Sequence, residues 1–284
     1  MSNAEKDLVK ELEMKAIKVR KLICEMTFNI GNSHLGGELS MTDFAVALYY
    51  RFLKFDPKNP KWDDRDRFVL SKGHGGGCMY NILADVGFYD RNLILTGYNK
   101  IDGKFGQHPN RKYIPGIEAS TGSLGHGMSL AVGMALAGRY KKKNYRVYSV
   151  SGDGELQEGT NWEAIMAAGH YELGNYVHFV DRNRLQINGD TEKIMRLDPL
   201  DKKFEAFNWE VHVIDGNNMK EIVTMLSSLP ESDSQTRRKP ICIIGNTVKG
   251  KGVDFMENQA KWHLGGIDDE TLQKCYDSIE RARK

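Results

Sequence analysis

The fold class of this chain is decided by one stretch, Tyr145-Arg146-Val147-Tyr148-Ser149-Val150-Ser151-Gly152-Asp153-Gly154. An apolar run of strand length passes directly into Gly-Asp-Gly, and a helix is predicted to begin near Thr160. In open parallel sheets, ligands bind beyond the carboxyl ends of the strands. Asp153 is therefore placed where a metal ion meets a ligand, and the flanking glycines let the backbone approach phosphate oxygens closely.

The next predicted strand carries a second oxygen ligand to the same edge. It covers 176–181 and continues as Asp181-Arg182-Asn183. Mg²⁺ binds about six oxygen atoms and takes few of them from protein. Asp153, Asn183 and a loop carbonyl near Leu185 would supply three protein ligands, and a diphosphate would supply others. Gly-Asp-Gly alone is a common turn, but its combination with an asparagine at the end of the next strand favours a metal and diphosphate site.

Strands and helices alternate along most of the chain. Strands are predicted at 67–71, 145–151, 176–181, 207–214 and 240–246, and helices at 5–29, 42–53, 78–86, 124–140, 160–172, 220–229 and 268–283. The segments 31–37 and 92–119 are expected to be loops. This alternation predicts an α/β fold in which a mostly parallel sheet is covered by helices on both faces. Without a repeat or a linker, we expect one domain over residues 1–284.

The composition excludes several classes of protein. Hydrophobic residues make up 40% and charged residues 27%, as in globular proteins, and the net charge of +2 gives no field that would attract nucleic acid. The four cysteines are widely separated, which disfavours a zinc site or a disulfide framework. The N-terminus is not a signal peptide, and no apolar run approaches the roughly 20 residues of a membrane span. We therefore expect a cytoplasmic protein without a membrane or nucleic-acid partner.

Four of the eight histidines lie in loops beside glycine or proline. Together, such imidazoles could bind sugar hydroxyls, contact phosphate and move protons near neutral pH. Each one alone is more often a satisfied polar residue. His126, His170 and His178 are interpreted as structural.

At these positions the sequence resembles transketolases, specifically the N-terminal half that binds the diphosphate of thiamine diphosphate. The resemblance runs in collinear order from His34 to His263. The matching segments are Asn32-Ser33-His34-Leu35-Gly36-Gly37, Ser71-Lys72-Gly73-His74-Gly75, Gly106-Gln107-His108-Pro109, Thr121-Gly122-Ser123-Leu124-Gly125-His126-Gly127, Gly152-Asp153-Gly154-Glu155-Leu156-Gln157-Glu158-Gly159, Asp181-Arg182-Asn183, Lys249-Gly250-Lys251-Gly252-Val253 and Trp262-His263.

The resemblance implies a role for each matching residue. Mg²⁺ or Ca²⁺ would be bound by Asp153, Asn183 and the Leu185 carbonyl. The diphosphate would contact Gly154, Asn183, His74 and His263, and the rest of the cofactor would lie against Gly122, Ser123 and Leu124. His34, His108 and His263 would face the donor sugar as catalytic residues. Glu158 matches a glutamate that reaches the partner active site across the dimer interface.

The length of the chain implies a partner. A complete transketolase chain is about twice as long and carries a second domain, which grips the pyrimidine ring and supplies the glutamate that starts catalysis, and a third domain. We therefore expect the N-terminal subunit of a split transketolase, paired with a C-terminal subunit, as an α₂β₂ assembly. The reaction would transfer a two-carbon ketol unit from a ketose phosphate to an aldose phosphate.

The segment after His263 departs from the family pattern. Leu264-Gly265-Gly266-Ile267-Asp268 stands where relatives have glycine, small residues and proline. This difference leaves the donor open and permits a branched or sulfonated sugar phosphate. Two alternatives remain: a subunit of the 2-oxo acid dehydrogenase or deoxyxylulose-phosphate synthase type, and a non-catalytic paralogue that binds the cofactor. The histidine loops at His34, His74 and His108 favour sugar chemistry over decarboxylation of oxo acids, and the retained metal ligands and histidines argue against a non-catalytic paralogue.

Overall fold

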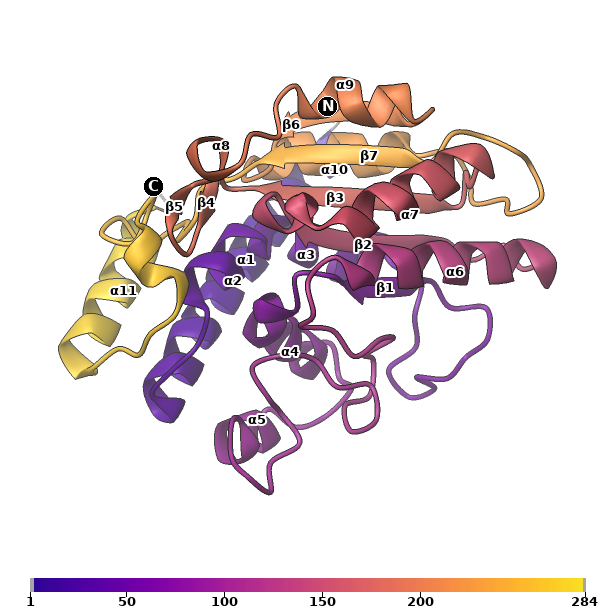
Figure 1. Ribbon diagram of the computed structural model, residues 1–284. Coiled ribbons are helices and arrows are strands. Elements are labelled where there is room, and N and C mark those ends of the chain that lie inside the picture. The colour runs from indigo at the N-terminus through magenta and orange to yellow at the C-terminus, as the bar shows by residue number, and fades with distance from the viewer. Residues whose placement is uncertain (1–2, 283–284) are drawn as a thin grey trace.

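The core of the molecule is a parallel sheet of five strands. The computed structural model describes residues 3–282. The strands lie in the order β1-β2-β3-β7-β6 (Figure 1). They are β1 (Arg67–Leu70), β2 (Val147–Gly152), β3 (Tyr176–Arg182), β6 (Glu210–Asp215) and β7 (Ile241–Asn246). The predicted α/β class, the predicted strands and their parallel pairing are confirmed.

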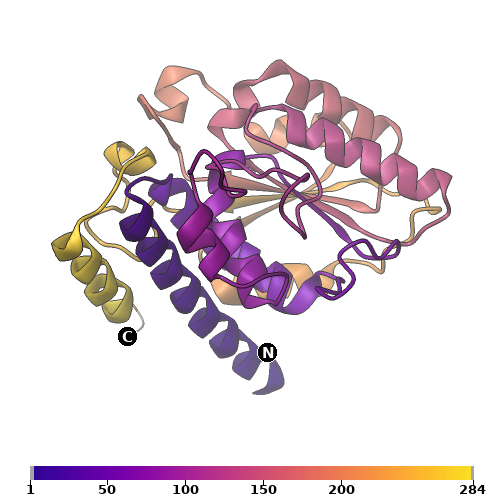
Figure 2. The ribbon, with the colours of Figure 1, turned by 90° about the horizontal axis from the view of Figure 1, so that it is seen from below.

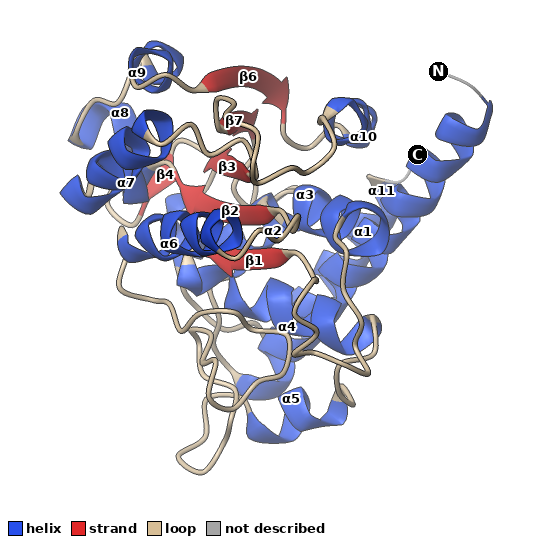
Figure 3. Cartoon of the chain, turned by 90° about the vertical axis from the view of Figure 1, so that its right-hand side faces the viewer, coloured by secondary structure: helices blue, strands red, loops and turns tan. Residues whose placement is uncertain are grey.

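Helices cover both faces of this sheet, as predicted (Figure 3). One face carries α6 (His126–Tyr140), α7 (Gly159–His170) and α9 (Leu200–Ala206). The other carries α1 (Asn3–Ile30), α3 (Thr42–Ala47), α4 (Gly76–Asp85) and α10 (Met219–Ser228). Side chains of β1 alternate between the two cores: Val69 packs with the first group of helices, whereas Phe68 and Leu70 pack with the second. The last helix, α11 (Asp269–Arg281), lies beside α1 (Figure 2).

Several local predictions were wrong. The expected loop 92–119 contains the helix α5 (Asn92–Gly97), in which Ile94 is buried. At the start of this helix, the Asp90 carboxylate accepts a hydrogen bond from the Asn92 N–H. The expected glycine loop gives way at Leu35 to α2 (Leu35–Ser40), whose residues are all buried. The predicted helix 42–53 is confirmed as α3 followed by a π-helical turn over Leu48–Phe52; only the type of its last turn was not foreseen. Glycine content lowers helix propensity, but burial of α2 against its neighbours overrides it.

After β3 come short elements that the hydrophobic periodicity of the sequence does not predict. They are the hairpin β4 (Leu185–Gln186) and β5 (Gly189–Asp190), and the helix α8 (Thr191–Ile194), capped by Asp190. Figure 1 places the hairpin beyond the ends of β3 and β7, where ligands bind in such sheets. The predicted end of the last helix, Arg283, lies outside the described residues. In the described part of the chain, no helix has the length and apolar character needed to cross a membrane.

Candidate active site

The strand register brings the two predicted metal-binding side chains to adjacent strand ends. Gly152 of β2 pairs with Asp181 of β3, and the Asp153 N–H donates to the Asp181 carbonyl at 3.3 Å. Asp153 therefore follows β2 immediately, and Asn183 lies two residues after Asp181, the residue of β3 that pairs with Gly152. Both are buried. The prediction that they meet at one sheet edge follows directly from the parallel pairing.

Backbone N–H groups hold these side chains in place. The Asp153 carboxylate accepts from the N–H groups of Gly154 at 2.8 Å and Arg184 at 2.9 Å. The Asn183 carbonyl oxygen accepts from the Leu185 N–H at 3.1 Å. Burial raises the pKa of Asp153, because a carboxylate without a compensating cation is costly inside the protein. Such a site gains from a bound cation.

The chemistry of the donor set fits Mg²⁺ or Ca²⁺. Within residues 3–282, no group of three or more His, Cys, Asp or Glu side chains could hold a metal ion. The predicted set instead has one carboxylate, one amide oxygen and one backbone carbonyl, which are hard oxygen donors. Hard cations accept such a set when phosphate oxygens and water complete the shell. The residues present therefore fit a metal ion that arrives with a diphosphate.

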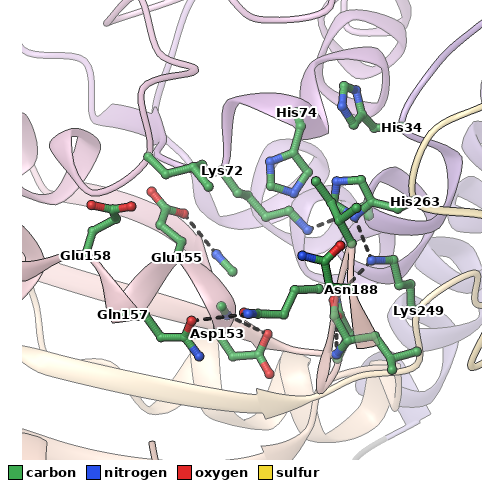
Figure 4. A pocket seen from close by; sticks show the side chains of 18 of the residues that line it. His34, Lys72, His74, Asp153, Glu155, Gln157, Glu158, Asn188, Lys249 and His263 are labelled. Atoms are coloured by element: carbon green, nitrogen blue, oxygen red, sulfur yellow. Dashed lines mark hydrogen bonds between the residues drawn. The ribbon is translucent and has the colours of Figure 1, made fainter. Parts of the chain in front are cut away.

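One cavity collects nearly all the predicted site residues (Figure 4). Its volume is about 520 Å³. The predicted residues that line it are His34, His74, His108, Gly122, Leu124, Asp153, Gly154, Glu158, Asn183, Leu185 and His263. Ser123 is the exception: it is exposed and its hydroxyl lies 3.4 Å from His126 Nδ1, so its side chain does not line the cavity.

Four histidines form a cluster on one side of this cavity. The ring centroid of His34 lies 5.5 Å from that of His74, 5.7 Å from that of His108 and 5.5 Å from that of His263. His74 and His263 are 5.4 Å apart. They come from segments far apart in the chain: His74 from a 3₁₀ turn (Gly73–Gly75), His263 from another (Ala260–His263), and the other two from the loops before α2 and α6.

A backbone bridge brings the first and last of these loops together. Ser33 and Gly265 exchange two N–H···O hydrogen bonds of 3.0 Å, which sets His34 beside His263. Gly266 must be glycine here, because an added Cβ would lie 2.1 Å from the Gly31 carbonyl oxygen. The segment that departs from the family pattern thus holds the loop of His263 against the loop of His34.

These imidazoles are neutral at physiological pH. Burial, then repulsion from His108 when that ring is also protonated and from the Lys72 and Lys249 ammonium groups, lowers the pKa of His34 to about 4. Burial and the Lys249 ammonium lower the pKa of His263 to about 3. Burial also lowers the pKa of His74 and of His108. Neutral rings can each donate one hydrogen bond and accept another, which suits contact with hydroxyl groups.

Two buried lysines in the cavity were not predicted. Lys72 Nζ donates to the Gly37 carbonyl at 2.9 Å and forms an ion pair with Asp181, both side chains being fully buried. Lys249 Nζ donates to the Leu185 carbonyl and lies 2.8 Å from His263 Nδ1. Both lysines stand in segments with sequence motifs, Lys72 before Gly-His-Gly and Lys249 before Gly-Lys-Gly, but a lysine in a loop is usually a solvated charge.

Glu155 holds the surrounding loops together and was also not predicted. Its carboxylate accepts from the N–H groups of Gly125 and Gly152, each at 3.1 Å, and from the Ser71 hydroxyl. One side chain thereby joins the β1 and β2 ends to the loop before α6. Gly122, in that loop, has φ +134°, and an added Cβ would lie 2.9 Å from the His108 ring. Only glycine lets these two parts of the loop approach each other.

The comparisons with known proteins identify the family. The family model for the thiamine diphosphate binding domain of transketolase matches residues 12–278. The chain belongs to the transketolase family. It is 41% identical over 254 residues to an apulose-4-phosphate transketolase subunit of Actinobacillus succinogenes, covering 89% of this chain and 90% of that one. It is 40% identical over 271 residues to a 6-deoxy-6-sulfo-D-fructose transketolase subunit of Clostridium sp., covering 95% and 97%.

Solved transketolases share the fold over nearly the whole chain. The transketolase of Campylobacter jejuni superposes with a TM-score of 0.84 at 29% identity, over 99% of this chain but 43% of that one. The chain thus spans less than half the length of that transketolase, whereas it spans nearly all of the two subunits named above. The predicted membership of the transketolase family and the thiamine-diphosphate-binding fold are confirmed.

Proposed function

We propose that this chain is the diphosphate-binding subunit of a two-subunit transketolase. One observation carries the proposal: a single cavity has hard oxygen donors at the sheet edge, Asp153, Asn183 and Leu185, and the four-histidine cluster on its other side. A cofactor tail with its metal would bind at the first, and a sugar would lie against the second. The activity is transfer of a two-carbon ketol unit from a ketose phosphate to an aldose phosphate.

Different residues of the cavity would contact different parts of the cofactor. Asp153, Asn183 and the Leu185 carbonyl would hold Mg²⁺ or Ca²⁺, and Gly154 and His74 would contact the diphosphate. When bound, thiamine diphosphate supplies the electron sink that allows a carbon–carbon bond beside a ketose carbonyl to break and re-form. Gly122 and Leu124 would lie along the cofactor, and the exposed edge at Glu158 would face a neighbouring subunit.

The contact with Lys249 fixes the form of His263. A protonated lysine is a donor only, so His263 Nδ1, 2.8 Å from Lys249 Nζ, is the acceptor. The proton of the neutral ring is then on Nε2, and His263 acts toward a ligand as a hydrogen-bond donor. His34 differs, because its buried Nδ1 has no hydrogen-bond partner among the described residues. With this nitrogen free of a protein partner, His34 would, together with His108, assist removal of a proton from a sugar hydroxyl.

The partner would supply what the chain needs for turnover. The complementary subunit would carry the pyrimidine-binding and third domains, and the pair would form an α₂β₂ assembly in the cytoplasm. This chain would contribute one domain to it. Two relatives named as transketolase subunits, for apulose 4-phosphate and for 6-deoxy-6-sulfo-D-fructose, support both the split arrangement and a donor other than the common ketose phosphates. The Leu264-Gly265-Gly266 segment beside the histidines is where donor specificity would differ.

Reconstitution tests the proposal. The chain is mixed with a candidate C-terminal transketolase subunit, thiamine diphosphate and Mg²⁺, and ketol transfer to an aldose phosphate is measured with apulose 4-phosphate, 6-deoxy-6-sulfo-D-fructose or xylulose 5-phosphate as donor. We expect turnover by the pair and none by either chain alone. The variant His34→Asn is expected to bind the cofactor but to lose transfer.

Three outcomes would contradict the proposal. Full turnover by this chain alone would contradict the two-subunit arrangement. Decarboxylation of pyruvate in place of ketol transfer would assign the chain to the 2-oxo acid branch. A third outcome is that the chain binds the cofactor but the pair has no activity toward any donor, although the same partner is active with another subunit. This outcome would indicate a non-catalytic paralogue.

A further inference from the structure

Glu38 is a buried carboxyl group without a role in the proposed function. It lies in α2 and is fully buried, and neither carboxyl oxygen has a hydrogen-bond partner among the described residues. Burial raises the pKa of Glu38 to about 8, and the nearby backbone N–H groups of Gly77 and His34 offset only part of this rise. At neutral pH the group is therefore an uncharged carboxylic acid.

The groups around Glu38 do not hold it as a carboxylate. The cation that acts on it is the Lys72 ammonium, which already forms an ion pair with Asp181. The other titratable groups in electrostatic range are thiols and phenols, and burial raises the pKa of each, except that contact with the Cys275 thiol comes first for Cys24. They carry no charge at neutral pH, and they are Cys24 of α1, Cys78 and Tyr80 of α4, and Tyr98 after α5.

The carboxyl group of Glu38 packs directly on the backbone of α4. A Cβ added to Gly77 would lie 2.6 Å from Glu38 Oε2 and 2.4 Å from Met26 Cε, so only glycine at this position leaves room for both side chains. Glu38 lies four residues after His34, and Gly77 lies three residues after His74. The contact therefore sets the spacing between the segments that carry these two histidines, whose ring centroids are 5.5 Å apart (Figure 4).

The preceding glycine makes a second contact of this kind. A Cβ added to Gly76 would lie 2.8 Å from the Gln107 carbonyl oxygen, and Gln107 directly precedes His108. The first turn of α4 thus receives the loop of His108 on one glycine and the side chain of Glu38 on the next. The contact through Gln107 is made by backbone, whereas the contact through Glu38 is made by a side chain and can be changed by substitution.

We propose that Glu38 is a positioning residue for His34 and His74, and that it acts as an uncharged group of fixed length between α2 and α4. This inference rests on the proposed function, in which His34 faces the donor sugar and His74 contacts the diphosphate. A shorter side chain leaves a gap at Gly77 into which the loop of His34 shifts. A carboxylate buried at this point favours protonated imidazoles, which no longer accept hydrogen bonds from hydroxyl groups.

Three substitutions at Glu38 test the inference in the reconstituted pair. Glu38→Gln keeps the length without a charge, Glu38→Asp keeps the acid but is shorter by a methylene group, and Glu38→Ala removes both. In Glu38→Asp and Glu38→Ala, kcat/KM for the donor should fall about tenfold or more, because a displaced His34 no longer meets the donor hydroxyl. Glu38→Gln should restore most of this loss. The affinity for thiamine diphosphate should fall less, because the metal ligands are unchanged.

Two measurements on the full-length chain require neither cofactor nor partner. In ¹⁵N NMR spectra of the histidine rings, Glu38→Asp should shift the signals of His34 and His74, and Glu38→Gln should shift them less. The second measurement is unfolding by urea. Because the folded pKa of Glu38 lies above the ordinary value of 4.5, the folded chain retains a proton that the unfolded chain loses as the pH rises. Relative to Glu38→Gln, the folding equilibrium constant of the wild type should therefore fall about 100-fold between about pH 5 and pH 7.5.

Matched controls separate these effects from general disruption. Glu11 on α1 is exposed, and Glu11→Gln should change neither the histidine signals nor the pH dependence of unfolding. Gly77→Ala adds a methyl group where the Glu38 carboxyl lies and should shift the signals of both histidines. Gly133→Ala on α6 should not, because an added Cβ there meets nothing within 4 Å. Circular dichroism checks that each variant is folded.

The difference between glutamine and aspartate decides the inference, because a merely structural role would not separate their effects on the histidine signals. If Glu38→Asp keeps transfer and Glu38→Gln loses it, the charge is required and the inference is wrong. It is also wrong if Glu38→Ala leaves the signals of His34 and His74 unchanged. If the wild-type pair transfers no ketol unit, the proposed function fails, and the NMR and unfolding measurements still decide the position and charge of Glu38.

Discussion

Replacement of Lys72 by methionine tests how the floor of the cavity is held together. Lys72 and Asp181 are both fully buried, and the Lys72 ammonium also donates to the Gly37 carbonyl at 2.9 Å. Lys72→Met leaves the Asp181 carboxylate with hydrogen bonds from Ser40 at 2.6 Å, Asn183 at 3.4 Å and the Thr247 hydroxyl, but without its ion-pair partner. The Gly37 carbonyl loses its side-chain donor.

The expected loss follows from these contacts. Removing one partner of a buried ion pair costs about 3–5 kcal/mol, because the remaining charge stays inside the protein. With about 2–4 °C lost per kcal/mol for a domain of this size, the melting temperature should fall by about 6 °C or more. Urea unfolding and thermal unfolding, both followed by circular dichroism, measure the two quantities. Adding Asp181→Asn to Lys72→Met should cost much less than the sum of the single changes, because the uncompensated charge is then absent.

The matched control is the same substitution at an exposed ion pair. Lys274 on α11 pairs with Glu270, and the two side chains are 59% and 77% exposed. Lys274→Met should cost less than about 1 kcal/mol, as for exposed ion pairs in general. If Lys72→Met costs no more than Lys274→Met, the reasoning about the buried pair is refuted. If the double variant is as unstable as the sum of the singles, the coupling between Lys72 and Asp181 is absent.

Three further predictions concern the site itself. Asp153→Asn keeps the shape of the side chain but removes its charge, so metal-dependent binding of thiamine diphosphate should weaken about tenfold or more by calorimetry, and an unchanged affinity would exclude Asp153 as a metal ligand. The folded pKa values of His34 (about 4) and His263 (about 3) lie below the ordinary value of 6.5, so the unfolded chain takes up protons first as the pH falls. The contribution of these two groups to the free energy of unfolding should therefore be largest above about pH 6.5 and decrease below it, whereas Glu38, whose burial raises its pKa to about 8, contributes with the opposite sign. Urea midpoints of the wild type and of His263→Asn at about pH 7.5 and about pH 5 check this: the stability of the wild type relative to the variant should be lower at about pH 5 than at about pH 7.5. Gly122→Ala places a Cβ 2.9 Å from the His108 ring, so reconstituted transfer should fall more than cofactor affinity, and equal losses in both would indicate general disruption of the loop.

Local sequence patterns were sufficient to predict which residues lie at the edge of the sheet, but not which loops form the histidine side of the cavity. Asp153 and Asn183 could be paired from the sequence because each follows an apolar run directly, and parallel strands end at the same edge. The loops of His34 and His263 come together through the bridge between Ser33 and Gly265, which joins segments more than 200 residues apart. Nothing in either segment alone specifies that contact. The resemblance to transketolases, rather than periodicity, supplied the histidines as a group.

Lys249 and Lys251 show most clearly what could not be predicted from the sequence. Lys249 and Lys251 are separated by one glycine in the same motif, yet Lys249 is buried beside His263 and Lys251 lies outside the cavity, paired with Glu257. The difference arises because the Gly36 backbone packs against the stem of only one of them. Likewise, α2 forms in a glycine-rich segment because it is enclosed on all sides, not because its residues favour a helix.

Short-range hydrophobic patterns and chain direction were enough to predict the α/β class, the parallel pairing of the strands and the placement of Asp153 and Asn183 just beyond the ends of β2 and β3. Packing between distant segments decided the ring-to-ring distances in the histidine cluster, the lowered pKa values of those rings and the burial of Lys249. These properties depend on burial and on contacts between distant segments, and burial is set by how the whole chain packs.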